Sequence, residues 1–179
     1  MEEWGRVEIS RMIKEEYCKL VENKIDKINF NEAVDKTVYE LPDKSLMEIS
    51  KEIFTIPELL FSADAIVGFK GLHKMIEQSL EKIEIETRKE LLSNIIVVGG
   101  NCLLHNFIER LQKELFQCEL GGLANKVKVF TSTGFMDIQH SSWVGGSIIS
   151  SMSNFEQLIM TQEDYEEHGA ILIERKCFS

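Results

Sequence analysis

The residues of this sequence that could approach a ligand most closely are the paired glycines Gly99 and Gly100. They follow an apolar run, Ile95 to Val98, and precede a segment whose apolar residues have helical spacing. Glycine can adopt positive φ and admit another group to the backbone, and the N-terminus of a following helix favours an anion. However, Gly-Gly-Asn is neither a dinucleotide-binding nor a phosphate-loop motif. These residues alone favour a turn that only reverses the chain, with a ligand site as the alternative.

Other groups that could support catalysis or metal binding are scattered. The four histidines are far apart in the sequence, and no serine or cysteine carries a nucleophile motif. The four cysteines form no Cys-x-x-Cys pair, so we expect free, mostly buried thiols and no zinc site. The acidic run from Glu163 to Glu167 lacks the alternating spacing and the glycine of a calcium loop, which favours a solvated helix. We predict no catalytic residue and no metal ligand in this chain.

Composition narrows the class of protein further. The chain has 179 residues, 44% of them hydrophobic, which suits one large globular domain or two small ones. Its formal charge of −10 at pH 7 disfavours direct binding to nucleic acid, whose backbone demands clustered Lys and Arg. The apolar runs are too short to cross a membrane, and the start "MEEWGRVEIS" is unlike a signal peptide. These features predict a protein of the cytoplasm or nucleus.

The elements before the glycines are predicted from periodicity. Apolar spacing predicts a helix over Val7 to Asp26. The segment "KTVYELPDKSLMEISKEIF", Lys36 to Phe54, alternates on both sides of a Pro-Asp-Lys turn and is interpreted as a hairpin. A short helical patch over Glu58 to Phe61 and a helix over Leu72 to Lys82 follow, and "TRKELLSN" supplies a further helical turn.

Around the glycines the pattern predicts a strand, a helix and a strand. Ile95 to Val98 is apolar on both faces, as a central strand covered by helices would be. Leu104, Phe107, Ile108, Leu111 and Leu115 form one helical stripe, and "KVKVF", Lys126 to Phe130, is the next strand. Such a βαβ unit pairs its strands in parallel, which indicates an α/β architecture.

Two further glycines, Gly145 and Gly146, lie in "SSWVGGSIISSM". Local rules allow a turn there, but the surrounding apolar residues have helical spacing, and glycine costs only about 1 kcal/mol within a helix. A helix that contains the double glycine is therefore preferred over the turn.

Six segments in order carry a resemblance to a known family. They are "MIKEEYC", "VYELPDKSLMEISKEIFTIPELLF", "GLHKMI", "VVGGNCLLHNFIERLQKEL", "SSWVGGSII" and "YEEHGAILIERKCF". Together they resemble the C-terminal half of actin and its relatives. Asn101 after the glycines, "SSW" before Val144, the "EEHG" and "ERKC" segments, and a longer loop from Thr131 to His140 look most like the actin-related protein of nuclear chromatin-remodelling and histone-acetyltransferase complexes.

The resemblance implies an α/β fold, namely the second half of an actin-like, ribonuclease-H-like molecule with an inserted small α+β lobe. Residues 1–67 would form the inserted lobe and residues 68–140 the ribonuclease-H-like part. Residues 141–179 would be a C-terminal helical tail that packs on a first half absent from this chain.

The resemblance also implies a nucleotide site. Its contacts would be Lys14, Glu15, Gly99, Gly100, Asn101, Leu104 and Gln139. A glutamate can accept hydrogen bonds from ribose hydroxyls, and a lysine can donate to a base or approach a phosphate. An adjacent Lys–Glu pair is otherwise an ordinary solvated helix face. Leu104 replaces an aromatic residue of actin and Gln139 a basic one, and both changes weaken the site.

The implied cofactor is ATP, bound by the full-length protein. The phosphate-gripping hairpins, the magnesium-binding acid and the water-positioning residue all resemble upstream segments, so we expect this chain alone to bind no nucleotide tightly and to catalyse nothing.

The implied function is that of a nuclear scaffold subunit. The partners would be actin, an amphipathic helix of a remodelling ATPase and other complex subunits, with no direct contact to nucleic acid or membrane. The helix would dock near Trp143, Val144 and Ile148, although Trp143 could equally be a core anchor. The face left by the first half could make the chain self-associate. The alternative is a cytoskeletal actin-like protein of the cytoplasm that polymerises and hydrolyses ATP when full-length.

Overall fold

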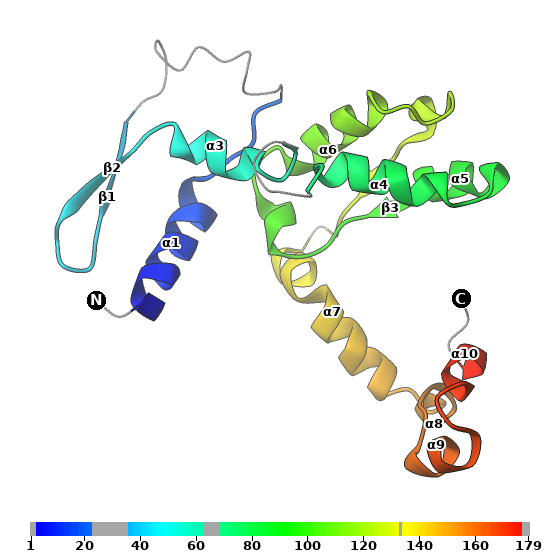
Figure 1. Cartoon of the computed structure of the whole chain (residues 1–179). Helices are drawn as coiled ribbons and strands as arrows, with labels where there is room; N and C mark the ends of the chain where they lie inside the picture. The colour runs from blue at the N-terminus through cyan, green and yellow to red at the C-terminus, as the bar shows by residue number, and fades with distance from the viewer. Residues whose placement is uncertain (1–2, 23–35, 63–68, 133, 177–179) are drawn as a thin grey trace. The chain divides into compact units, whose positions relative to one another are not determined.

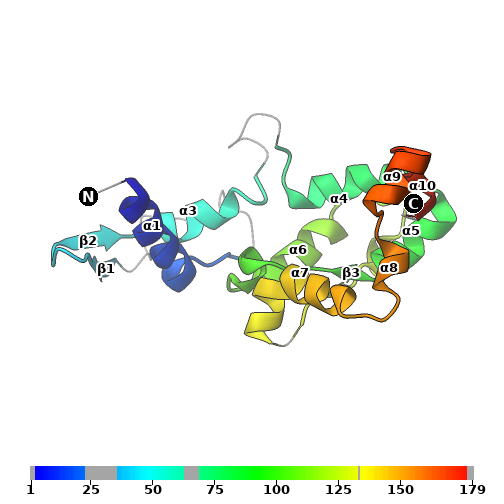
Figure 2. The same ribbon diagram turned by 90° about the horizontal axis from the view of Figure 1, so that it is seen from below.

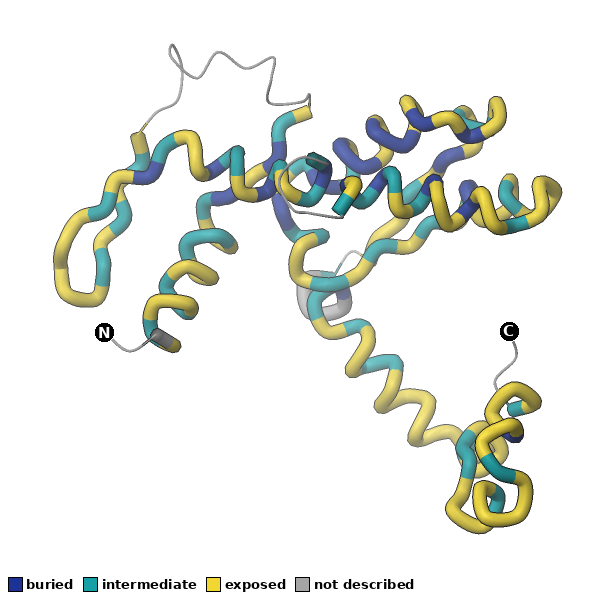
Figure 3. The backbone as a smooth tube through the Cα atoms, viewed as in Figure 1, coloured by how far each residue is buried: buried dark blue, intermediate teal, exposed yellow. Residues whose placement is uncertain are grey.

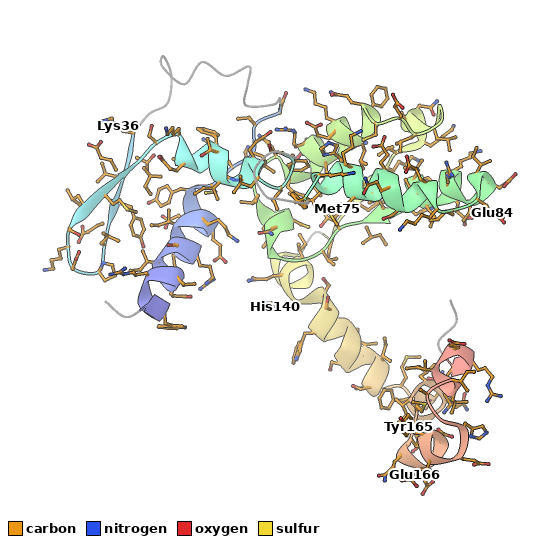
Figure 4. The ribbon with its side chains drawn as sticks, in the orientation of Figure 1. Lys36, Met75, Glu84, His140, Tyr165 and Glu166 are labelled. Carbon is orange, nitrogen blue, oxygen red and sulfur yellow. The ribbon has the colours of Figure 1, made fainter. Side chains whose placement is uncertain are left out.

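The computed structural model describes residues 3–22, 36–62, 69–132 and 134–176. They belong to two compact units, Met1–Gln139 and His140–Ser179. His140, labelled in Figure 4, begins the second unit. The predicted boundary between residues 67 and 68 falls outside the described residues and stays a prediction.

The first unit begins with a helix and a hairpin (Figure 1). The elements are α1 (Glu3–Tyr17), β1 (Thr37–Glu40), β2 (Leu46–Ile49) and α3 (Glu52–Glu58). The predicted hairpin is confirmed, because β1 and β2 pair antiparallel with Thr37 opposite Ile49. Its turn is closed by a hydrogen bond from the Leu41 amide to the Ser45 carbonyl (2.9 Å), and the Ser45 amide donates to the Asp43 carboxylate (3.0 Å).

Two predicted boundaries in this region are wrong. The helix predicted over Val7 to Asp26 ends at Tyr17, because the next residues pair with distant backbone: the Lys19 amide donates to Ile53 (3.1 Å) and the Leu20 amide to His105 (3.0 Å). Residues 23–26 of that prediction lie outside the described residues. The end of the predicted hairpin, from Glu52, is the start of α3. Of the helical patch predicted over Glu58 to Phe61, Glu58 is the last residue of α3 and the other residues form the turn that follows.

The centre of the first unit is the predicted βαβ unit. Its elements are α4 (Leu72–Glu81), α5 (Ile85–Leu92), β3 (Ile95–Ile96), the 3-10 helix η2 (Gly100–Leu103), α6 (Phe107–Phe116), the 3-10 helix η3 (Ala124–Lys126) and β4 (Val129–Phe130). β3 and β4 pair in parallel, with Ile95 opposite Val129, which confirms the predicted connection through α6. Helices α4 and α6 lie side by side in Figures 1 and 2.

The βαβ unit departs from the prediction in two respects. Each strand is two residues long, and in the strand predicted as covered on both faces the residue Ile96 is 72% exposed. The helix starts at Phe107, not at Leu104, because Asn106 takes a left-handed conformation (φ 63°) and its side-chain amide donates to the Leu20 carbonyl (3.0 Å). Leu104 remains buried without being part of the helix.

The core of the first unit gathers around α6 and the segment that follows α1, where buried backbone is concentrated in Figure 3. Its buried members include Leu20, Phe61, Leu80, Leu92, Leu104, Phe107, Leu111, Leu115, Leu120 and Val127. On α6, the buried positions are Phe107, Arg110, Leu111, Glu114 and Leu115, which is the i, i+3, i+4, i+7, i+8 pattern of a core-facing helix. Two of these five positions carry charged side chains.

The guanidinium of Arg110 is only 1% exposed and is held by several partners. It donates to both carboxylate oxygens of Glu58 (2.9 and 2.6 Å), to Glu114 (2.9 Å) and to the Val21 carbonyl (3.0 Å), and it lies over the ring of Phe61. Burial alone would lower the pKa of Arg110, but the hydrogen bonds and charges of Glu58 and Glu114 outweigh it and raise this pKa. The cation therefore stays charged inside the core.

The second unit is helical. Helix α7 (Phe135–Ser150) enters it and is followed by α8 (Phe155–Leu158), α9 (Gln162–His168) and α10 (Leu172–Lys176). Gly145 and Gly146 lie inside α7, so the helix preferred over a turn is confirmed, and the loop predicted over Thr131 to His140 becomes α7 from Phe135 onward. No helix in the described part of the chain is both long and apolar enough to cross a membrane.

The acidic segment of the second unit is the solvated helix α9, which bears the exposed Tyr165 and Glu166 of Figure 4. A capping box starts it: the Asp164 amide donates to the Thr161 hydroxyl and the Thr161 amide to the Asp164 carboxylate, both at 3.1 Å. Lys176 of α10 also donates to Asp164 (2.8 Å). These hydrogen bonds, the one from Lys176 first, hold the pKa of Asp164 at about 2.

Replacing Arg110 by methionine should destabilise the first unit by about 3–5 kcal/mol, because the carboxylates of Glu58 and Glu114 then lose their buried counter-charge. Hydrogen exchange of the α6 amides measures the change in that unit separately. The matched control is Arg11→Met, since Arg11 also pairs with two glutamates but at the surface, where little change is expected. Equal effects of the two substitutions would contradict this account.

Replacing Lys176 by methionine should raise the pKa of Asp164 from about 2 toward its ordinary value of 3.8. A carboxylate with a depressed pKa stabilises the fold above its unfolded pKa, so the contribution of Asp164 is present above about pH 4 and is lost as the pH falls to about 2. Carboxyl NMR titration measures this pKa. Asp43, whose pKa is lowered by hydrogen bonds from Ser45, serves as the control and should not change.

Candidate functional site

Five of the seven residues predicted to contact a nucleotide line one pocket. The pocket has a volume of ≈ 170 Å³, and its lining residues are Lys14, Glu15, Gly100, Leu103, Leu104 and Gln139. We call it the Gly100 pocket. Asn101 is not among the lining residues but contacts Lys14, and Gly99 precedes Gly100 in the same turn. The last turn of α1, η2 and the start of α7 thus meet within the first unit.

Lys14 connects α1 to the double-glycine turn. Its ammonium group donates to the Asn101 side-chain oxygen at 3.2 Å, across 87 residues of sequence. Lys14 can still donate to another acceptor, because an ammonium group has three donors. This contact gives Asn101 a structural role beside the binding role that was predicted for it.

The backbone conformation requires glycine at Gly99 but not at Gly100. Gly99 has φ +100°, which L side chains rarely adopt; its amide donates to the Ile138 carbonyl (2.7 Å) and its carbonyl accepts from Cys102 (3.0 Å). A Cβ at Gly100 would meet no atom within 4 Å. Packing within the described chain therefore does not require glycine at Gly100, whereas a ligand lying against the backbone would.

The glycines are not followed directly by the N-terminus of the long helix, which was the basis for the alternative of a ligand site there. The glycines lead into η2, a 3-10 helix of four residues, and α6 begins only at Phe107, beyond the left-handed Asn106. A macrodipole requires a longer run of aligned peptides. The turn thus offers an open backbone surface instead of a phosphate cradle.

Glu15 is already engaged in the structure. Arg11 donates to both of its carboxylate oxygens (2.9 Å each) and also pairs with Glu8. These hydrogen bonds, those to Glu8 first, raise the pKa of Arg11, and the same hydrogen bonds lower the pKa of Glu8. A carboxylate has about four acceptor positions, so Glu15 could accept from a ribose hydroxyl as well. Sequence reasoning missed Arg11, although the i, i+4 spacing from Arg11 to Glu15 could have revealed it.

The wall formed by Leu103 and Leu104 is apolar, with the half-buried Gln139 beside it. Leu103 was also missed, since only its neighbour Leu104 matched a position of the family. The volume of ≈ 170 Å³ is below the roughly 300–1,000 Å³ of complete small-molecule sites. Among the described lining residues Lys14 alone is cationic. This arrangement suits a flat group with polar edges, such as a base and its sugar, better than a triphosphate.

Comparisons with known proteins agree with the resemblance. The family model described as Actin matches residues 1–178. Actin-related protein 4 of Oryza sativa subsp. indica is 34% identical over 181 residues, covering 94% of this chain and 40% of that protein. Actin-related protein 4 of Arabidopsis thaliana is 33% identical over 178 residues (92% and 40%). Putative actin-29 of Dictyostelium discoideum is 36% identical over 141 residues (78% and 36%).

The chain spans about 40% of the length of the curated Actin-related protein 4 relatives it matches. The family match extends over nearly the whole of the present sequence, and the parallel β3–α6–β4 unit and the mixed helices and small sheets suit an α/β actin-like fold. The chain belongs to the actin family.

Proposed function

We propose that this chain is part of a nuclear actin-related protein that serves as a scaffold subunit of chromatin-remodelling or histone-acetyltransferase complexes. The observation that carries the proposal is the similarity to Actin-related protein 4 over 92–94% of the chain. Because the chain has a formal charge of −10, we propose that other subunits make the contacts to nucleic acid.

The Gly100 pocket is proposed as the base and ribose side of an ATP site that is complete only in the full-length protein. Lys14 and Glu15 supply polar contacts, Gly100 supplies open backbone, and Leu103 and Leu104 supply an apolar wall. Catalysis of phosphoryl transfer depends on positioned cations and on an oriented water. Because the pocket offers one lysine and no second cation among its described residues, the chain itself is proposed to be non-catalytic.

The proposed docking surface for a partner helix lies on the second unit. Several large apolar side chains of α7 and the following turn are exposed there: Trp143, Ile148, Ile149 and Met152. An amphipathic helix commonly binds such a surface through apolar anchors. Actin and a helix of the remodelling ATPase are the proposed partners, and the nucleus is the proposed location.

The second candidate is a cytoskeletal actin-like protein, favoured by the similarity to Putative actin-29. Pelleting of the full-length protein after addition of ATP and magnesium separates the two functions. Ordered filaments would support the cytoskeletal function and refute the scaffold, whereas a soluble protein that enriches actin and remodelling subunits from nuclear extract would support the scaffold.

The 179-residue chain alone should bind ATP no better than it binds adenosine, because Lys14 is the only cation in the described lining and the chain carries a formal charge of −10. Titration calorimetry with each ligand measures this. A micromolar dissociation constant for ATP would contradict the prediction, since that affinity requires phosphate contacts beyond those of the Gly100 pocket.

Replacing Trp143 by alanine in the full-length protein should weaken retention of the partner helix by about 2 kcal/mol or more, which is roughly 30-fold, as for a buried aromatic anchor. Quantitative co-purification with actin and the remodelling ATPase measures the loss. Trp4→Ala is the matched control, because Trp4 and Trp143 are equally exposed (76%). Normal retention by the Trp143 variant would exclude Trp143 as an anchor.

A further inference from the structure

A second pocket of the first unit lies between α1, β2 and α3, with a volume of ≈ 220 Å³. Ile13 and Tyr17 of α1 line one side, Met47 and Ile49 of β2 another, and Ile53 and Ile56 of α3 a third. We call it the α1–α3 pocket. It is larger than the Gly100 pocket, and neither the resemblance nor the family match assigns it a role.

The walls of the α1–α3 pocket are mainly aliphatic. Four isoleucines and Met47 present hydrocarbon and thioether surface, and the buried Cys18 thiol adds a small apolar group. Tyr17 is held in place by an edge-to-face contact with Tyr39 of β1, with ring centroids 6.0 Å apart and planes at 89°. The hairpin and α1 thus give the pocket a fixed aromatic wall.

Each of the three charged groups of the lining already has a partner, although only Glu48 has one of opposite charge. Glu48 pairs with Lys36 (2.8 Å), which is labelled at the start of the hairpin in Figure 4. Glu52 accepts from the Ser50 amide (3.1 Å), and Lys14 donates to Asn101. Most of the lining is hydrocarbon, so a charged occupant would leave water for an apolar surface, which is unfavourable. The occupant that fits this lining is therefore uncharged.

The volume sets the size of the occupant. An engineered apolar cavity of about 150 Å³ holds a benzene molecule, so ≈ 220 Å³ accommodates one or two fused rings. We propose that the α1–α3 pocket is a binding site for a small, neutral, one- or two-ring aromatic molecule. The ring would contact the isoleucines and Tyr17 and would lie against the Cys18 thiol.

One residue joins this pocket to the Gly100 pocket. Lys14 lines both, while Ser10, Ile13 and Tyr17 face the α1–α3 pocket and Glu15 faces the other. An occupant of the α1–α3 pocket would therefore change the environment of the Lys14–Asn101 hydrogen bond. Binding of the aromatic molecule does not depend on the proposed function. An effect of that binding on nucleotide affinity does, because it requires the Gly100 pocket to be a nucleotide site.

Indole, an uncharged two-ring molecule, is the probe. Titration of the isotope-labelled 179-residue chain with indole should shift the amide resonances of Ile13, Met47 and Ile53 saturably, with a dissociation constant of about 1 mM or below. The side-chain amide of Asn101 should shift with them. Ile13→Trp should abolish the shifts by filling the pocket, and Met12→Trp, a neighbouring exposed position outside the lining, should preserve them.

Absence of saturable shifts in the unmodified chain, or equal shifts in the Ile13 and Met12 variants, would overturn the proposal. Shifts of the same amides on raising the protein concentration without indole would assign the pocket to a second copy of the chain and would also overturn it. A silent Asn101 amide beside shifting pocket amides would refute the connection through Lys14.

A second measurement does not depend on the folding of a variant. N-phenylmaleimide should modify Cys18 severalfold more slowly when indole is saturating, as measured by peptide mass spectrometry. Cys102 does not line the α1–α3 pocket and serves as the internal control, so its rate should stay unchanged. Identical Cys18 rates with and without indole would overturn the proposal.

Discussion

The buried guanidinium of Arg110 is the constraint on which the first unit depends. It is the point where α6, the end of α3 and the segment after α1 converge, through Glu58, Glu114 and the Val21 carbonyl. Other backbone groups of the segment after α1 make hydrogen bonds too: its amides donate to the carbonyls of Ile53 and His105, and one of its carbonyls accepts from the Asn106 side chain. These hydrogen bonds fix where α1 ends, and they therefore place Lys14 and Glu15 beside the double-glycine turn.

Such a cluster is costly to build, because a charge taken out of water is stable only when every donor and acceptor is satisfied. The raised pKa of Arg110 shows which effect is larger here: burial opposes the cation, and the hydrogen bonds and charges of Glu58 and Glu114 more than offset it. Replacing the whole cluster, Glu58 and Glu114 included, by apolar side chains can be as stable, but such a core has no directional hydrogen bonds. The guanidinium specifies one arrangement of α3 and α6, since only that arrangement aligns its fork with the Glu58 carboxylate.

Both pockets follow from this arrangement because α1 forms a wall of each. The i, i+3, i+4, i+7 stripe of Ser10, Ile13, Lys14 and Tyr17 faces the α1–α3 pocket, and Lys14 with Glu15 faces the Gly100 pocket. A helix that carries two sites on adjacent faces can transmit a small displacement between them, since it moves as a rigid element. The ammonium group of Lys14, held by Asn101, is the group at which both sites meet.

The sequence by itself determined the family, the hairpin, the βαβ unit and the helix through Gly145 and Gly146, because these rest on periodicity and on ordered motifs along the chain. It also pointed to the residues that gather at the Gly100 pocket, whose binding role stays a prediction. The tertiary structure alone decided that α1 ends at Tyr17, that Arg110 and Glu114 are buried, and that one face of β3 is exposed. The physical reason is distance along the chain. Arg110 pairs with Glu58 and donates to the Val21 carbonyl, which are 52 and 89 residues away, and the spacing of neighbouring residues cannot predict such distant partners.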